Sequence, residues 1–169
     1  AQPFAGVRTV LLGSDGEIWL PVHGFFPLSR AVEAGAATER FFAQNKDVLE
    51  KYRIRTSYLT CFSGAEFVIE PSFYWHDALG DFRLSLIEEE FARKWQSIPP
   101  DTETRAVVLG LRDALRDLYD SLGGCHLQIG KYYRYEDVMK DARLWRLINQ
   151  VKDAVDPGRR VNPGSLGLR

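Results

Sequence analysis

The chain has 169 residues, which suits one domain with its own core, and 45% of them are hydrophobic, as in packed globular proteins. Lysine and arginine number 22 against 23 acidic residues, so the net charge of −1 argues against a basic nucleic-acid-binding surface. No stretch approaches the roughly 18 apolar residues of a membrane-spanning helix, and no secretory signal opens the chain. We therefore expect a cytoplasmic protein without a membrane span.

The cysteines and the first residue add two expectations. Cys61 and Cys125 form no C-x-x-C pair, which favours buried free thiols in a reducing compartment over a disulfide framework or a zinc site. Residue 1 is alanine and the only methionine is Met139. We therefore expect this chain to be a processed or excised part of a longer protein.

The first half of the chain predicts a strand, a helix and a hairpin. Residues 17–23 favour a strand, with Pro21 near an edge or a bulge. Residues 25–28 are expected to connect this strand to a helix over residues 30–53, for which Ser29 is a plausible N-cap. Residues 56–62 and 65–70 alternate as strands around the tight Ser63-Gly64 break, which predicts a hairpin.

The second half predicts mostly helices. Residues 71–75 are aromatic and are expected to be irregular, and residues 82–95 have helical spacing up to the Pro99-Pro100 break. Asp101 or Thr102 is expected to cap a helix that ends at Gly123-Gly124. Its predicted inner stripe is Val107, Leu111, Leu115, Leu118 and Leu122. A short strand over residues 125–129 and a helix over residues 138–155 follow. The predicted inward residues of this last helix are Ala142, Trp145, Ile148, Val151 and Val155.

This order of strands and helices predicts the class of fold. Strands and helices segregate as in an α+β protein whose helices cover one face of an antiparallel sheet. We expect a ferredoxin-like βαβ-βαβ arrangement in one domain spanning residues 1–169, without internal repeats.

Residues 124–135 are dense in polar groups that can perform chemistry. If residues 125–129 form a strand, His126 and Gln128 share one face, which looks outward or into a cavity. Lys131, Tyr133 and Arg134 follow directly after Gly130, which permits close backbone approach. A tyrosine hydroxyl and a permanently charged arginine can stabilise an oxyanion such as a phenolate, and a histidine can act as a base.

The last fourteen residues carry the most specific pattern in the chain. Asp156-Pro157-Gly158 ends a helix and Asn162-Pro163-Gly164 follows, which predicts an ordered hook rather than a frayed tail. Together with residues 124–135, this ending resembles the C-terminal cap or substrate domain of the FAD-linked oxidoreductases of the vanillyl-alcohol oxidase and p-cresol methylhydroxylase family. The resemblance covers most of the chain and is specific from Gly124 onward and in residues 17–23 and 69–75.

The resemblance implies a cofactor, a reaction and roles for individual residues. It implies oxidation of a para-substituted phenol, an alcohol or a hydroxy acid by hydride transfer to FAD. Tyr133, Arg134 and His126 would be catalytic, with the tyrosine on the substrate phenolate and the arginine near the flavin. Many relatives carry proline where this chain has Arg134, so the arginine favours the phenol-oxidising members. The remaining implied contacts are Lys131, Asn162 and Arg134 with the cofactor, and Gln128, Tyr74 and Trp75 with the substrate.

The resemblance also implies partners. No glycine-rich G-x-G-x-x-G loop is present to hold a pyrophosphate. We therefore expect the FAD-binding domain upstream of this chain or on a partner chain, and the chain alone to be inactive. The family also implies a homodimer that forms through the cap domain.

Several alternatives remain open from the sequence. A tyrosine–arginine step after a strand is commonly a surface stack or salt bridge, and His23 fits a structural histidine. The three histidines, His76 among them, lack metal-ligand spacing, so no metal is expected. A free-standing ferredoxin-like module that binds a ligand or a protein without catalysis is the second hypothesis. A nucleic-acid-binding domain is a weaker third hypothesis because the chain has no basic aromatic strand motif.

Overall fold

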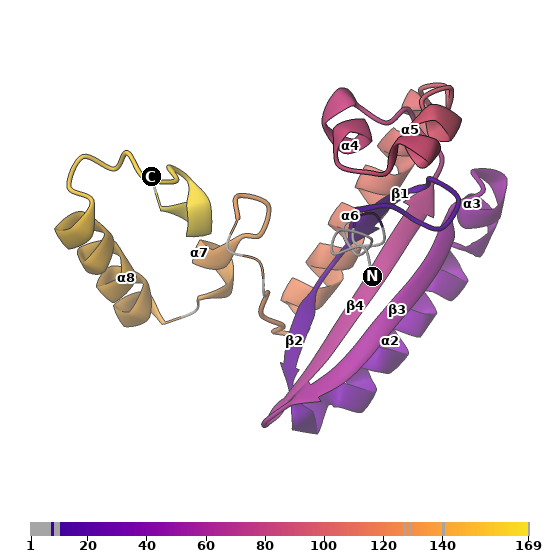
Figure 1. The fold of residues 1–169 in the computed structure, drawn as a ribbon. Coiled ribbons are helices and arrows are strands. Elements are labelled where there is room, and N and C mark those ends of the chain that lie inside the picture. Colours follow the sequence, from indigo (N-terminus) through magenta and orange to yellow (C-terminus); the bar gives the residue numbers. More distant parts are fainter. Residues whose placement is uncertain (1–7, 9–10, 127, 129, 140, 169) are drawn as a thin grey trace.

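The computed structural model describes residues 8, 11–126, 128, 130–139 and 141–168. The centre of the fold is an antiparallel sheet built around β4 (Glu66–Trp75) (Figure 1). β3 (Arg55–Ser63) pairs with one edge of β4 along its whole length. β1 (Ile18–Pro21) and β2 (Gly24–Pro27) pair in succession with the other edge, so they act as one interrupted strand.

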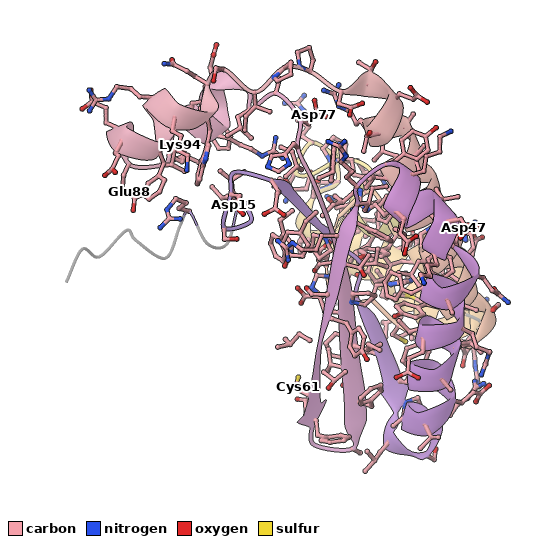
Figure 2. All side chains as sticks on the ribbon, turned by 90° about the vertical axis from the view of Figure 1, so that its right-hand side faces the viewer. Asp15, Asp47, Cys61, Asp77, Glu88 and Lys94 are labelled. Carbon is pink, nitrogen blue, oxygen red and sulfur yellow. The ribbon has the colours of Figure 1, made fainter. Side chains whose placement is uncertain are left out.

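The order of the elements is ferredoxin-like. The free edge of β2 bonds to Cys125, with Phe25 N 2.8 Å from Cys125 O and Cys125 N 2.9 Å from Phe25 O. α2 (Ala31–Gln44) follows β1 and β2 along the chain and leads to β3. α6 (Thr102–Ser121) follows β4 and two short helices, and leads to Cys125. α2 and α6 pack on the same face of the sheet (Figure 2). The predicted α+β class with a ferredoxin-like antiparallel sheet is confirmed.

The hydrophobic core lies between the sheet and these two helices. Phe67, Ile69 and Phe73 of β4 alternate toward the helices and are buried. On α6 the fully buried stripe contains Leu111 and Leu115 as predicted and continues through Val108 and Tyr119. The predicted Val107, Leu118 and Leu122 are partly buried against the same core. Tyr119 is accommodated in the core because its hydroxyl meets Thr38 of α2 at 2.9 Å.

Two predictions about the sheet were wrong. Residues 25–28, expected as a connection, lie largely in β2, and residues 71–75, expected to be irregular, form the second half of β4. The Pro71 carbonyl points to the β1–β2 side of β4, where it accepts the Val22 N–H at 2.9 Å. The N–H that proline lacks would point to this same side. Pro71 fits inside this central strand because the pairing is interrupted there, between β1 and β2.

The predicted long helices are divided. The helix expected over residues 30–53 is a 3-10 turn η1 (Leu28–Arg30), α2 and α3 (Lys46–Lys51), and Ser29 caps none of them. Asn45 ends α2 because its side-chain amide donates to the Phe41 carbonyl at 2.8 Å. The helix expected over residues 82–95 is α4 (Asp81–Ser85) and α5 (Glu89–Trp95). The predicted Asp101 cap of α6 is confirmed, since its carboxylate accepts the Thr104 N–H at 2.9 Å.

The C-terminal part lies beside the sheet and its helices, and consists of α7 (Tyr135–Val138), α8 (Ala142–Val155) and the 3-10 turn η2 (Ser165–Gly167) (Figure 1). The prediction that Val151 and Val155 point inward is wrong within this chain, because they are 54% and 76% exposed. Trp145 and Ile148 are half-buried, and the Ala142 side chain lies outside the described ones.

The structure differs from the expectations for residues 125–129 and for the two thiols. Where a strand was expected over residues 125–129, Cys125 forms an isolated bridge with Phe25, and residues 127 and 129 lie outside the described residues. Both cysteines are free as predicted, but they are exposed and not buried.

Candidate functional site

The predicted site segment after α6 is fixed to that helix by three side chains. Tyr132 lies under the guanidinium of Arg112, 3.5 Å from its ring centroid, and donates its hydroxyl to Asp113 at 2.9 Å. Gly124 allows the turn that begins the segment, because a Cβ there would lie 2.8 Å from the Phe26 ring. His126 and Arg134 also contact carboxylates of α6, as described below.

His126 is buried between the segment and the sheet. Its Nδ1 lies 2.8 Å from the His23 carbonyl, its Nε2 lies 2.7 Å from Asp120 Oδ1, and its ring stacks on Tyr133 at 4.0 Å. A carbonyl oxygen can only accept, so Nδ1 carries a hydrogen and donates it. Both ring nitrogens are therefore engaged inside the chain, and a role of His126 as a base remains a prediction.

Tyr133 is 3% exposed, and its hydroxyl accepts the backbone N–H of His23 at 3.1 Å. Burial raises the pKa of this phenol above its usual value, and the His23 hydrogen bond opposes that shift. The His23 ring lies 2.7 Å from Glu70 through Nε2, while its buried Nδ1 has no hydrogen-bond partner among the described residues. The ring of His23, which fits a structural histidine, is thus held through Nε2.

Arg134 is oriented by two carboxylates of α6. Its Nη2 lies 2.5 Å from Asp117 Oδ1 and 2.8 Å from Asp120 Oδ2. The hydrogen bond with Asp120 is the largest cause of the raised pKa of this guanidinium. Since its side chain is 43% exposed, Arg134 is fixed in place but remains accessible.

The C-terminal hook folds back onto this segment. The Leu166 N–H donates to the Gly130 carbonyl at 3.0 Å, and Gly164, with φ of 86°, adopts a conformation that favours glycine. Asp156 begins the hook, because its carboxylate accepts the N–H groups of Arg160 and Val161 at 3.0 and 2.9 Å. These bonds, after the one from Lys152, lower the pKa of Asp156 to about 2.

The two segments together line an open cavity of 340 Å³. Its lining residues are Lys131, Tyr133, Arg134, Tyr135, Glu136, Asp137, Gly164 and Gly167. The structure thus brings together Lys131, Tyr133 and Arg134 of the predicted site. Asn162 belongs to the hook but does not line the cavity, and the buried His126 lies directly behind Tyr133.

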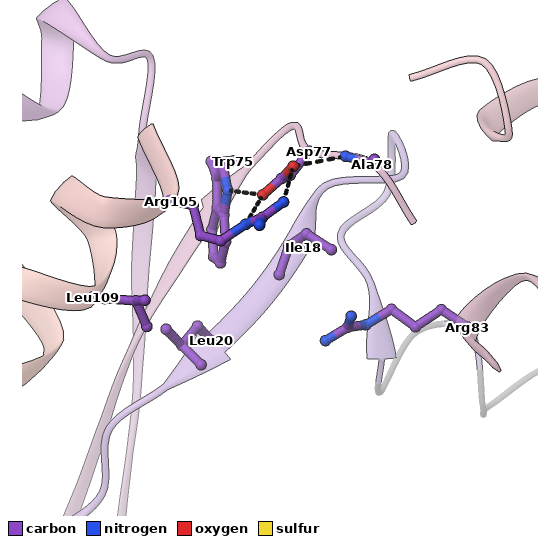
Figure 3. Close-up of a pocket in the computed structure, with 8 residues that line it drawn as sticks. All are labelled: Ile18, Leu20, Trp75, Asp77, Ala78, Arg83, Arg105 and Leu109. Atoms are coloured by element: carbon purple, nitrogen blue, oxygen red, sulfur yellow. Dashed lines mark hydrogen bonds and ion pairs between the residues drawn. The ribbon is translucent and has the colours of Figure 1, made fainter. Parts of the chain in front are cut away.

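The remaining predicted substrate residues lie elsewhere. Gln128 is exposed, and its carbonyl accepts the Tyr135 hydroxyl. Tyr74 lies on the helix-free face of the sheet under Arg55, 3.9 Å from the guanidinium carbon to the ring centroid. Trp75 faces the opposite side and borders a separate cavity of 240 Å³ with Asp77, Arg83 and Arg105 (Figure 3).

Sequence reasoning missed most of the polar partners. The Arg105 guanidinium holds Asp77 through two bonds of 2.6 and 2.7 Å, and Arg55 similarly holds Glu17 through two bonds of 3.0 Å. These partners are 28 and 38 residues apart, so no local spacing could have paired them.

Comparisons with known proteins give no relative for this chain: no protein-family model, no curated protein and no solved structure matches it. Within the described part of the chain, no group of three or more metal-ligating side chains is placed to hold a metal ion. None of the described helices combines the length and apolar character needed to span a bilayer.

Proposed function

We propose that this chain is the substrate-binding cap portion of a larger FAD-dependent oxidoreductase that oxidises a para-substituted phenol, an alcohol or a hydroxy acid. One observation carries the proposal. The specific part of the resemblance lies in residues 124–135 and in the C-terminal hook. Described residues of these two segments, Lys131 and Tyr133 to Tyr135 on one side and Gly164 and Gly167 on the other, line one cavity. The hydroxyl-bearing Tyr133 and the cationic Lys131 and Arg134 are all at that cavity.

The size and charge of the cavity fit a small phenolic or acidic substrate. At 340 Å³ it lies at the small end of ligand pockets, which span about 300–1,000 Å³, so it suits a one-ring molecule. Lys131 and Arg134 favour an oxyanion such as a phenolate, and Asp117 and Asp120 hold the arginine in position. Tyr133, rigid because of its stack on His126, can orient the substrate oxygen.

The size of this cavity argues against FAD binding by this chain alone. FAD would supply the hydride acceptor, but a dinucleotide is too large for this cavity, and the chain lacks a glycine-rich phosphate loop. We therefore place the FAD-binding domain upstream or on a partner chain, with Lys131 and Asn162 as the nearest contacts from this side. Tight stoichiometric FAD binding by the isolated chain would contradict this division.

A second candidate function has its own support. A free-standing ferredoxin-like module would keep its polar groups bonded internally, as Tyr133 is to His23 and Arg134 is to Asp117 and Asp120. Such a module would bind a ligand or protein without redox chemistry. Formation of a homodimer is compatible with either function.

Tyr133→Phe in the flavin-bearing protein tests the role proposed for Tyr133. We expect kcat with a para-substituted phenol to fall at least about tenfold, because the hydroxyl that orients the substrate oxygen is lost. Stability should also fall by about 1 kcal/mol, since the buried His23 N–H loses its acceptor. Tyr132→Phe is the matched control, because it loses a hydrogen bond to Asp113 without lining the cavity. Equal turnover in both variants would remove Tyr133 from the reaction.

A further inference from the structure

A second cavity, of 240 Å³, lies between β1, α4 and α6 (Figure 3). It shares no lining residue with the cavity beside the C-terminal hook. Ile18 and Leu20 of β1 and Leu109 of α6 give it apolar walls, and Trp75 borders it at the end of β4. A ligand with an apolar body therefore has a surface to pack on here.

One of the two arginines at this cavity, Arg105, is already neutralised. Its Nε and Nη2 bind Asp77 at 2.6 and 2.7 Å. The same carboxylate accepts three further bonds, from Trp75, Ala78 and Asp101. A carboxylate offers about four lone-pair sites, so Asp77 has no capacity left for a second cation.

The other arginine, Arg83, carries a charge that is not neutralised. Its half-buried side chain extends from α4 toward Ile18 and Leu20 (Figure 3). Within the described part of the chain, no carboxylate or other polar group bonds to its guanidinium. Arginine stays protonated, and a cation partly removed from water is unfavourable until an anion meets it. The cavity therefore combines apolar walls with one unneutralised positive charge.

We propose that this cavity binds a small carboxylic acid with an apolar body. Its carboxylate would pair with Arg83, and its body would lie against Leu20 and Leu109. The planar guanidinium matches a carboxylate through two parallel hydrogen bonds, and a single free charge suits a monoanion. The volume lies just below that of most ligand pockets, about 300–1,000 Å³, so the body is one ring or a short chain.

This site is a second ligand site and does not depend on the proposed oxidoreductase function. The residues that carry that function lie at the hook, and none of them borders this cavity. A bound acid would connect the short helix α4 to β1 and α6. Because the ligand binds only the folded chain, the Tm should rise with its concentration.

The first test uses benzoate and the purified chain. Binding is followed by NMR at the indole N–H of Trp75, so that the signal reports this cavity and not the one at the hook. We expect saturable movement of that signal with a Kd of about 1 mM or tighter, as for a one-ring ligand. Benzamide keeps the ring without the charge, and inorganic phosphate keeps the charge without the ring. Each should bind at least about tenfold more weakly than benzoate.

The second test changes the arginine. Arg83→Met keeps the apolar stem and removes the charge, so benzoate affinity should fall at least about tenfold, and Arg83→Lys should restore part of it. Arg93→Met is the matched control on α5, because Arg93 is 69% exposed and lies away from the cavity. Arg134→Gln, at the hook cavity, should also leave the affinity read at Trp75 unchanged.

Three results would overturn the proposal. The first is a Trp75 signal that does not move at about 10 mM benzoate, well above the expected Kd. The second is equal benzoate affinity in wild type and Arg83→Met, which would reduce Arg83 to an apolar cover over β1. The third is binding of benzamide or phosphate as tight as that of benzoate.

Discussion

Asp77 offers the strongest single test of how this fold is held together. Its carboxylate is 2% exposed and accepts five hydrogen bonds, two of them from Arg105 at 2.6 and 2.7 Å. The others come from Trp75, Ala78 and Asp101, so this carboxylate joins the end of β4 to the start of α6 (Figure 3). Burial raises the pKa of Asp77, but these bonds outweigh burial and lower it from 3.8 to about 2.

The lowered pKa sets the size and the pH range of the effect. The difference between 3.8 and about 2 corresponds to about 2 kcal/mol, at 1.36 kcal/mol per pH unit. Because the folded-state pKa is the lower one, this stabilisation is complete above about pH 4 and is lost as the pH falls toward 2. Asp77→Asn removes the charge at every pH. We expect it to lower the free energy of unfolding by about 2 kcal/mol at pH 7, and the Tm by roughly 4–8 °C.

Urea unfolding of both proteins at pH 7, 4 and 2 measures this difference. The gap between wild type and Asp77→Asn should shrink to about 0.5 kcal/mol at pH 2, where much of the wild-type carboxyl is protonated. Asp47→Asn, at an exposed position on α3 (Figure 2), should stay within about 0.5 kcal/mol of wild type throughout. A gap that does not change between pH 7 and pH 2 would refute the assigned role of the Asp77 charge.

Two further predictions concern the core. Leu115→Ala removes a fully buried side chain between α6 and the sheet and should cost about 2–5 kcal/mol in urea unfolding, whereas a cost below 1 kcal/mol would mean that α6 is not packed there. Thr38 donates to the Ala34 carbonyl, so Tyr119 donates to Thr38, and Tyr119→Phe should cost about 1 kcal/mol. Burial raises the pKa of Tyr119 well above its usual range, in keeping with a neutral donor. Thr38→Val should remove most of the effect of Tyr119→Phe in a double-mutant cycle, and strict additivity would exclude the bond.

The parts of the fold that depend on local signals could be predicted. The β3–β4 hairpin follows from alternation around Ser63-Gly64, and the start of α6 follows from the Asp101 cap. Pro71 was misinterpreted because its place in β4 depends on the interruption between β1 and β2, which are remote in sequence. The sequence predicts an apolar stripe along the last helix, but it cannot show that Val151 and Val155 of this stripe remain exposed, because that depends on which element packs against α8.

In the candidate site, too, the residues close in sequence could be predicted and their distant partners could not. Lys131, Tyr133 and Arg134 were found together because they are neighbours in sequence, and the hook was found because its Pro-Gly breaks are local. Their positioning partners were missed, since Asp117 and Asp120 look like ordinary solvent-facing acids of a helix. Only the path of the chain after Gly124 brings Arg134 to them.

The measurement that tests the central claim most directly is the native form of this polypeptide. An antibody against the chain would be used to purify it from its source under native conditions, followed by denaturing gel analysis and a flavin absorbance spectrum. We expect flavin in the purified material, either with a polypeptide far above 19.3 kDa or with a co-purifying flavin-binding chain. A 19.3 kDa polypeptide recovered without flavin and without a flavin-binding partner would contradict the assignment as a cap domain and favour the free-standing module.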